Sequence, residues 1–241
     1  MIPWLPPQPR FPPLESALAE PNGLLAAGGD LRPERLIKAY RAGIFPWYAE
    51  GEPILWWSPD PRLVLFPDEF KLSRSLAKTL RRADFEVRCD SDFEQAVAAC
   101  AAPRQGAGGT WISPEMQRAY LRLHQLGYAH SVEVWSAGRL VGGLYGVALG
   151  AVFYGESMWS AVRDASKIAL AHLCRHLENH AYAVIDCQMT TSHLCSLGAR
   201  ELARSEFAAL LERHAGSASN AAQAPGRWRE NAMQDLFVQA S

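Results

Sequence analysis

Three polar side chains stand at the ends of apolar runs that must be buried. Glu156 follows the glycine-spaced run VGGLYGVALGAVFYG, and Asp186 and Gln188 close the strand that begins AVID. Burying a carboxylate costs several kcal/mol unless a partner compensates its charge, so a purely structural role does not easily explain these residues. We therefore take Glu156, Asp186 and Gln188 as the candidate catalytic site.

These residue types suit the attack of an amine on an activated acyl group. The amide of Gln188 is not a strong base, but its carbonyl can accept a hydrogen bond from the amine and so orient the lone pair. Asp186, on the same face of the strand, can orient that amide and offset the charge that develops on nitrogen. Glu156 can hold a cationic residue of the acceptor. Such a reaction needs positioning and oxyanion donors, without a metal, ATP or a covalent enzyme intermediate.

Two other patterns could indicate a nucleophile and a metal site, but the sequence favours neither. Cys187 lies between the last two of these residues, but side chains alternate along a strand, so we expect it to point away from them into apolar surroundings, where a thiol is inert. His172, His176 and His180 recur every fourth residue, which is metal-ligand spacing. An HExxH site would need Glu at position 173, where the chain has Leu, so we predict a solvated helix face and no metal.

Caps, prolines and apolar runs indicate the elements that must position the site. The first sixty residues are rich in proline, and we expect one helix there, from Asp30 as N-cap to Gly43, among loops. Alternating strands and helices follow. The expected strands are 62–66, 85–89, 131–135, two within 140–159, and 183–186, and the expected helices begin at Ser73, Ser91 (with Glu94 in capping-box spacing), Ser113, Asp164 and Ser205.

This pattern predicts an α+β protein with a small N-terminal α/β domain. The boundary is expected in WWSPDPR, where two prolines end regular structure before the next strand. We therefore expect a small domain at 1–62, a catalytic domain at 63–215 and a flexible tail at 216–241, whose composition is typical of disorder.

Composition limits the functional classes. The 241 residues carry a net charge of −1 and five cysteines at irregular spacing, and they hold no signal peptide or apolar run long enough for a membrane span. We expect a cytoplasmic protein with reduced thiols. Nucleic-acid affinity would need a local basic patch, and one exists in Lys71, Arg74, Lys78, Arg81, Arg82 and Arg88, although a solvated helix face is the alternative.

Three meander strands followed by a helix and a fourth strand form the core of GNAT-type acyltransferases. The members that use acetyl-CoA bind its pyrophosphate with a glycine-rich loop before the long helix. The corresponding segment here, Met158 to Lys167, contains no glycine. A CoA donor is therefore disfavoured, and an acyl group carried by tRNA fits the basic helix and the N-terminal tryptophans better.

Several blocks of the chain carry a specific resemblance. They include EPNGLLAAGGDL (20–31), YRAGIFPWY (40–48), ILWWSPDPR (54–62), LVGGLYGVALGAVFYGESMWS (140–160), IDCQ (185–188) and HLCSLGA (193–199). In these blocks the chain closely resembles the bacterial leucyl/phenylalanyl-tRNA–protein transferases, which have a GNAT-like catalytic domain. The resemblance implies transfer of Leu or Phe, and less well Met, from aminoacyl-tRNA to proteins that begin with Arg or Lys, which marks them for N-degron degradation.

The resemblance also implies site residues and partners. It implies Asp186 and Gln188 as the catalytic pair, although a substrate-assisted route through the terminal adenosine is also argued for the family. It implies an aminoacyl pocket lined by Leu144, Met158, Leu170, Leu173 and Ile185, with Ser166 near its floor. Trp47, Tyr48 and Trp111 are candidates for stacking on the terminal adenosine, and Arg74, Lys78, Arg81 and Arg82 for binding tRNA phosphates.

The expected enzyme is a monomer without a cofactor. Two alternatives stay open from the sequence: a CoA-dependent N-acyltransferase, and a non-catalytic tRNA-binding protein on the same fold.

Overall fold

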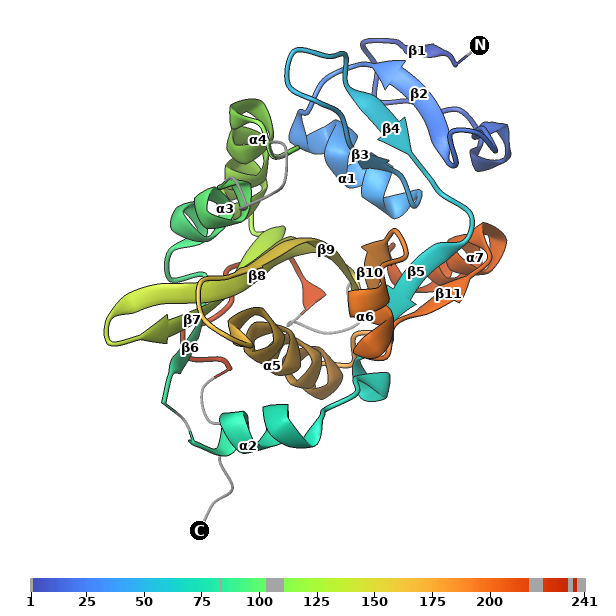
Figure 1. The fold of residues 1–241 in the computed structure, drawn as a ribbon. Helices are drawn as coiled ribbons and strands as arrows, with labels where there is room; N and C mark the ends of the chain where they lie inside the picture. The colour runs from blue at the N-terminus through green and yellow to red at the C-terminus, as the bar shows by residue number, and fades with distance from the viewer. Residues whose placement is uncertain (1, 83, 103–110, 217–222, 234–235, 238–241) are drawn as a thin grey trace.

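The computed structural model describes residues 2–82, 84–102, 111–216, 223–233 and 236–237, which form two sheets with helices packed on them (Figure 1). None of the helices in these ranges is long and apolar enough to cross a membrane. The expected flexible tail lies partly outside the described residues, at 217–222, 234–235 and 238–241.

The small N-terminal unit contains a four-stranded sheet, where only one helix and loops were expected. Its strands, in the spatial order β1-β2-β4-β3, are β1 (Trp4–Leu5), β2 (Leu24–Gly28), β4 (Leu55–Trp57) and β3 (Phe45–Pro46). These strands have two to five residues, too few to show an alternating pattern in the sequence. The helix is confirmed as α1 (Pro33–Arg41). Asp30 does not cap it directly but accepts a hydrogen bond from the Arg32 backbone at 3.0 Å.

The larger unit is a seven-stranded sheet, which contains the six expected strands and one more. In spatial order its strands are β11 (Arg200–Leu202), β5 (Arg62–Leu65), β10 (Val184–Gln188), β9 (Val152–Ser160), β8 (Arg139–Leu149), β7 (Ala129–Ser136) and β6 (Glu86–Cys89). Its longer helices are α2 (Arg74–Arg82), α3 (Phe93–Ala101), α4 (Pro114–Gln125), α5 (Ala165–Asn179) and α7 (Arg204–His214). The sequence reasoning missed β11, the short helix α6 (Ser192–Ser196), and the 3₁₀ turns Leu14–Ser16 and Pro67–Glu69.

Of two further expected helix caps, one is confirmed and one is wrong. Ser113 caps α4 by accepting a hydrogen bond from the Met116 backbone at 3.2 Å, as predicted. The cap of α3 is Asp92, which accepts from the Gln95 backbone at 3.0 Å, and not Ser91. The Ser91 hydroxyl instead donates to Glu133, a fully buried carboxylate that needs donors.

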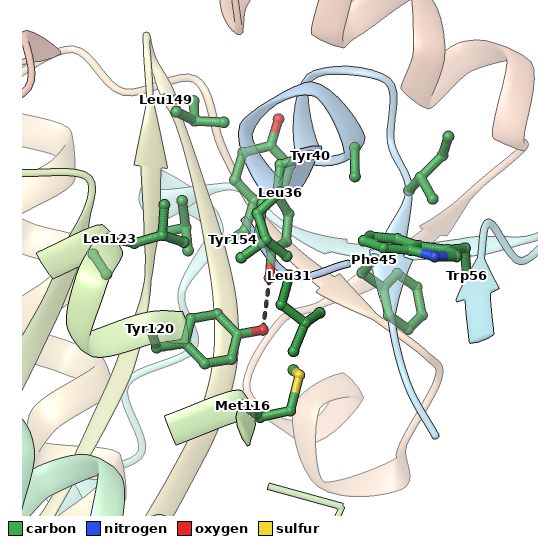
Figure 2. Close-up of a cluster of buried hydrophobic side chains, with 14 of the residues drawn as sticks. Leu31, Leu36, Tyr40, Phe45, Trp56, Met116, Tyr120, Leu123, Leu149 and Tyr154 are labelled. Carbon is green, nitrogen blue, oxygen red and sulfur yellow. Dashed lines mark hydrogen bonds between the residues drawn. The ribbon is translucent and has the colours of Figure 1, made fainter. Parts of the chain in front are cut away.

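The two faces of the large sheet have separate hydrophobic cores. Helices α5 and α2 cover one face, with Phe153, Ile168 and Leu173 in its core. On the other face α3 and α4 pack together with the small unit, and Figure 2 shows Tyr40, Trp56, Met116 and Tyr120 in this shared core. Successive β8 residues alternate between these cores, so the sheet can present a pocket on one face and polar partners on the other.

The order of strands on which the GNAT-like expectation rested is present. β7, β8 and β9 form an antiparallel meander, and α5 then leads to β10, which pairs parallel to β9 only through Val184–Asp186 and Val152–Tyr154. From Gly155 onward β9 continues along β8 without β10, so the two parallel strands separate. This separation positions the site.

The described part of the C-terminal segment packs on the sheet, although it falls within the expected tail. Trp228 stacks on His130 with ring centroids 4.2 Å apart, and Met233 is fully buried. This segment also covers α5, so His172 and His176 are buried and the prediction of a solvated helix face was wrong. Burial lowers the pKa of His172 to about 4, and the described residues contain no cluster of three potential metal ligands.

Candidate active site

An apolar pocket opens where β9 separates from β10. Its volume is about 140 Å³. An apolar cavity of about 150 Å³ in another protein accommodates benzene, so this pocket has the size for one aromatic or branched aliphatic side chain. It is lined by Leu144, Tyr145, Phe153, Gly155, Glu156, Ser157, Met158, Leu170, Leu173, Ile185, Cys187, Gln188 and Leu194.

Most of the expected pocket residues line this cavity. Leu144, Met158, Leu170, Leu173 and Ile185 all contribute to its wall. Ser166 does not. It lies in the first turn of α5, where its backbone N–H donates to the Ser160 hydroxyl at 2.8 Å, whereas the cavity is lined by residues one and two turns further along the helix.

Gln188 is one of the polar residues that line the pocket, and its backbone departs from regular strand geometry. The ladder between β10 and β5 shifts register between Asp186 and Gln188, and Gln188 has a φ of 59°. A non-glycine residue in this left-handed region needs local support. The side chain of Asp186 supplies it, because its Oδ1 accepts a hydrogen bond from the Gln188 backbone N–H at 3.0 Å.

Asp186 therefore acts on Gln188 differently from the expectation. Its carboxylate contacts the Gln188 backbone, and the Gln188 amide nitrogen lies 3.5 Å from Oε1 of Glu156 instead. Asp186 itself is fully buried and does not line the pocket. It can fix the position of Gln188, while the amide orientation comes from the neighbouring strand.

A buried arginine compensates the Asp186 charge. Arg62 donates from Nε to Oδ1 at 2.8 Å and from Nη2 to Oδ2 at 2.7 Å, and both side chains are inaccessible to solvent. Its guanidinium lies 4.8 Å from the ring centroid of Phe45 and 4.9 Å from that of Phe207. Arg62 thus links the small unit, α7 and β10 through a bidentate pair and two cation–π contacts.

Sequence reasoning missed Arg62 as a site residue. It was placed only at the domain boundary, at the start of the strand RLVLF. One signal was available: a carboxylate predicted at a buried strand end requires a cation, and Arg62 opens a strand in the same sheet.

Two tyrosines hold the Glu156 carboxylate. The Tyr40 hydroxyl, from α1, donates to Oε1 at 2.8 Å, and the Tyr120 hydroxyl, from α4, donates to Oε2 at 2.5 Å. The two hydroxyl oxygens are 2.7 Å apart. Burial raises the pKa of Glu156 to about 7, with a further increase from Asp186, although the two tyrosine hydrogen bonds oppose the shift. Neither tyrosine was identified from the sequence.

Cys187 lines the pocket beside Gln188, contrary to the prediction that it would point away. The register shift after Asp186 interrupts the alternation on which the prediction relied. Burial raises the pKa of the Cys187 thiol far above its usual range, so the thiol is still expected to be unreactive, because of its burial and not because of its direction.

A family model described as leucyl/phenylalanyl-tRNA protein transferase matches residues 64–212, and one for the N-terminal domain of the same proteins matches residues 29–60. A leucyl/phenylalanyl-tRNA–protein transferase of Azoarcus sp. (strain BH72) is 67% identical over 213 residues, which cover 88% of this chain and 91% of the relative. The chain belongs to the leucyl/phenylalanyl-tRNA–protein transferase family.

A second relative agrees with this assignment. The transferase of Aromatoleum aromaticum (strain DSM 19018 / LMG 30748 / EbN1) is 61% identical over 228 residues, 95% of this chain and 94% of the relative. A solved GCN5-related N-acetyltransferase from Kribbella flavida matches at 13% identity and a TM-score of 0.36, over 67% of this chain and 57% of that one. That score is too low to bear on function.

The surface residues that the family suggests for tRNA lie apart from the pocket wall. Arg74, Lys78, Arg81 and Arg82 are all exposed on α2 and form no ion pair with the described residues, while Leu76 and Leu80 bury the other face of this helix. Helix α2 is therefore amphipathic, with its cations facing solvent.

The three candidates for stacking on the terminal adenosine differ in accessibility. Trp47 is 39% exposed and meets Trp57 edge-on, with ring centroids 5.6 Å apart. Trp111 is partly buried against the core shared with the small unit. Tyr48 is buried, and its hydroxyl donates to Glu115 at 3.3 Å, so its ring is the least available for stacking.

Proposed function

We propose that this protein transfers Leu or Phe, and less well Met, from aminoacyl-tRNA to the N-terminal α-amino group of proteins that begin with Arg or Lys. The family membership over most of the chain carries this proposal, and the pocket supports it. The pocket is mostly apolar, with Glu156, Ser157 and Gln188 as the polar residues of its wall, and it is large enough for a Leu or Phe side chain. Met158 in its wall is unbranched and polarizable, which suits a pocket that accepts both shapes.

In the proposed reaction the donor side chain enters this pocket and places its ester carbonyl beside Gln188. The Gln188 carbonyl accepts a hydrogen bond from the acceptor amine and orients its lone pair toward the ester carbon. Asp186 and Arg62 hold the Gln188 backbone in its left-handed conformation. The ester is already activated, so its aminolysis needs no cofactor from the protein.

The donor tRNA is proposed to bind along α2. Four exposed cations on one helix face suit phosphate contacts, which position a nucleic acid without reading its sequence. Trp47 and Trp111 are the better candidates for stacking on the terminal adenosine, and the buried Tyr48 supports their position through its bond to Glu115.

The proposed acceptors are proteins that begin with Arg or Lys, and the transfer leads to their degradation. We place the enzyme in the cytoplasm as a monomer, where an added Leu or Phe marks the acceptor for N-degron degradation. Glu156 was expected to hold the cationic first residue of the acceptor. Its two carboxylate oxygens already accept hydrogen bonds from the hydroxyls of Tyr40 and Tyr120. This arrangement supports a role for Glu156 in the reaction other than binding the acceptor cation.

Mass spectrometry of a peptide acceptor tests this function. The protein is incubated with Phe-tRNA and a peptide that begins with Arg, and the peptide mass is expected to increase by one Phe residue. A peptide that begins with Glu and an N-acetylated Arg peptide are the matched controls and should stay unmodified. An unmodified Arg peptide, or modification from acetyl-CoA instead, would contradict the proposal.

A further inference from the structure

Glu156, Tyr40 and Tyr120 form a closed ring of three oxygen contacts at hydrogen-bond distance. The distances are 2.8 Å from the Tyr40 hydroxyl to Oε1, 2.5 Å from the Tyr120 hydroxyl to Oε2, and 2.7 Å between the hydroxyls. Figure 2 shows the two tyrosines pointing toward each other from α1 and α4, joined by a dashed line. Glu156 lines the aminoacyl pocket, whereas Tyr40 and Tyr120 belong to the core shared with the small unit.

The ring can hold one more proton than its two hydroxyl groups supply. An ionised Glu156 leaves only the two hydroxyl protons for three contacts, so one close pair of oxygens has no hydrogen between them. A protonated Glu156 supplies the third proton, and each of the three contacts then becomes a hydrogen bond. The ring therefore accommodates one exchangeable proton with little movement.

That proton belongs to the carboxyl group. Both tyrosines are buried, which raises each pKa well above the usual value, and the Glu156 charge raises it further. The pKa of Glu156 is raised to about 7. The groups that face it are Tyr40 from α1, Tyr120 from α4, Tyr145 from β8, Asp186 and Gln188 from β10, and Arg62 from β5.

The ring is connected to the site of attack. The Gln188 amide nitrogen lies 3.5 Å from Oε1 of Glu156, and both residues line the pocket. No other carboxylate among the described residues lines it. We propose that Glu156 takes the proton that the acceptor amine loses during attack and returns it to the ribose oxygen that leaves, with Tyr40 and Tyr120 as positioning residues that hold this proton in the ring.

The step balances without another reactant. The amine lone pair forms the C–N bond, the ester C–O bond breaks and its electron pair stays on the ribose oxygen. One proton moves from the nitrogen to Glu156 and then to that oxygen, so the enzyme ends in its starting state. This inference rests on the proposed transfer reaction and assigns its proton path, which that proposal leaves open.

The pH dependence of kcat distinguishes this role. With saturating Phe-tRNA and Arg peptide, wild-type kcat is expected to rise with pH and level off as Glu156 ionises, while Glu156→Gln should lower kcat, remove this inflection and leave the peptide KM unchanged. Tyr40→Phe removes a hydrogen bond that stabilises the carboxylate, so the inflection should move to higher pH. Ionisation of the peptide amine itself would not respond to this variant.

Tyr154→Phe is the matched control. The Tyr154 hydroxyl is buried without a hydrogen-bond partner in the described chain, and its ring lies 5.0 Å from that of Tyr40. This variant should keep the wild-type profile. An unchanged profile in Glu156→Gln, or a raised KM for the Arg peptide with kcat unchanged, would overturn the proton role, the latter in favour of recognition of the acceptor cation. Absence of transfer by the wild-type protein would instead refute the proposed function.

Discussion

Breaking the buried pair of Arg62 and Asp186 should destabilise the protein far more than breaking an exposed pair of similar geometry. Arg62→Met leaves the Asp186 carboxylate without its cation in a site that solvent does not reach. Breaking a buried pair in this way costs about 3–5 kcal/mol. Replacing Asp186 alone should cost a similar amount, because a guanidinium is then left unpaired.

Urea denaturation of a double-mutant cycle measures this coupling. Arg62→Met combined with Asp186→Asn removes both charges and keeps an oxygen that can accept from the Gln188 backbone. The double variant is therefore expected to be more stable than Arg62→Met alone. Asp186→Ala removes that oxygen, so it should also lose turnover beyond its loss of folded protein, because the Gln188 backbone loses its support.

An exposed pair provides the control. Arg200 and Glu69 are 3.0 Å apart, but their side chains are 49% and 44% exposed, so Arg200→Met should cost only about 0–1 kcal/mol. If Arg62→Met cost no more than Arg200→Met, or if the double variant lost the sum of the two single effects, the role assigned to the pair would be refuted.

Three further predictions follow from the pocket, the basic helix and the raised carboxyl pKa. Leu170→Phe narrows the pocket and should raise the KM for Phe-tRNA more than for Leu-tRNA in steady-state assays; equal changes would argue against this pocket. Changing Arg74, Lys78 and Arg81 together to Ala should weaken Phe-tRNA binding. The slope of log K against log salt concentration should become shallower by roughly 0.7–0.9 per lost phosphate contact, and turnover of an aminoacyl-adenosine donor should change little. The pKa of Glu156 in the folded protein is about 7, above its ordinary 4.5, so folding favours the protonated form. The free energy of unfolding of the wild type, relative to that of Glu156→Gln, should therefore be highest below about pH 4.5 and fall by up to about 3 kcal/mol as the pH rises to about 7. Urea midpoints of both proteins at pH 5 and pH 8 measure this change.

The sequence indicated polar residues that line the pocket, but it did not indicate the side chains that hold them. Gln188 and Glu156 were predicted as site residues because each ends an apolar run that had to be buried, and both line the pocket. Arg62 lies 124 residues before Asp186, and Tyr40 lies 116 residues before Glu156. Spacing along one helix or strand carries no information on such contacts, which depend on how the two units pack.

Local patterns also failed where the backbone departed from regular geometry. The register shift at Gln188 turned Cys187 toward the pocket against simple alternation. Four strands of the small unit are too short for a detectable period. The burial of His172 and His176 depended on a C-terminal segment whose composition indicated a flexible tail.

Turnover by Gln188→Ala tests most directly whether this pocket is the site of transfer. The side chain contributes no charge to the core, so Phe-tRNA affinity and the urea midpoint should match wild type, while turnover on the Arg peptide falls by a factor on the order of 10²–10³. All three quantities can be measured on one preparation. Near-normal turnover would contradict the catalytic role of Gln188 and favour the substrate-assisted route, and a loss of activity only in proportion to a lower urea midpoint would make the residue structural.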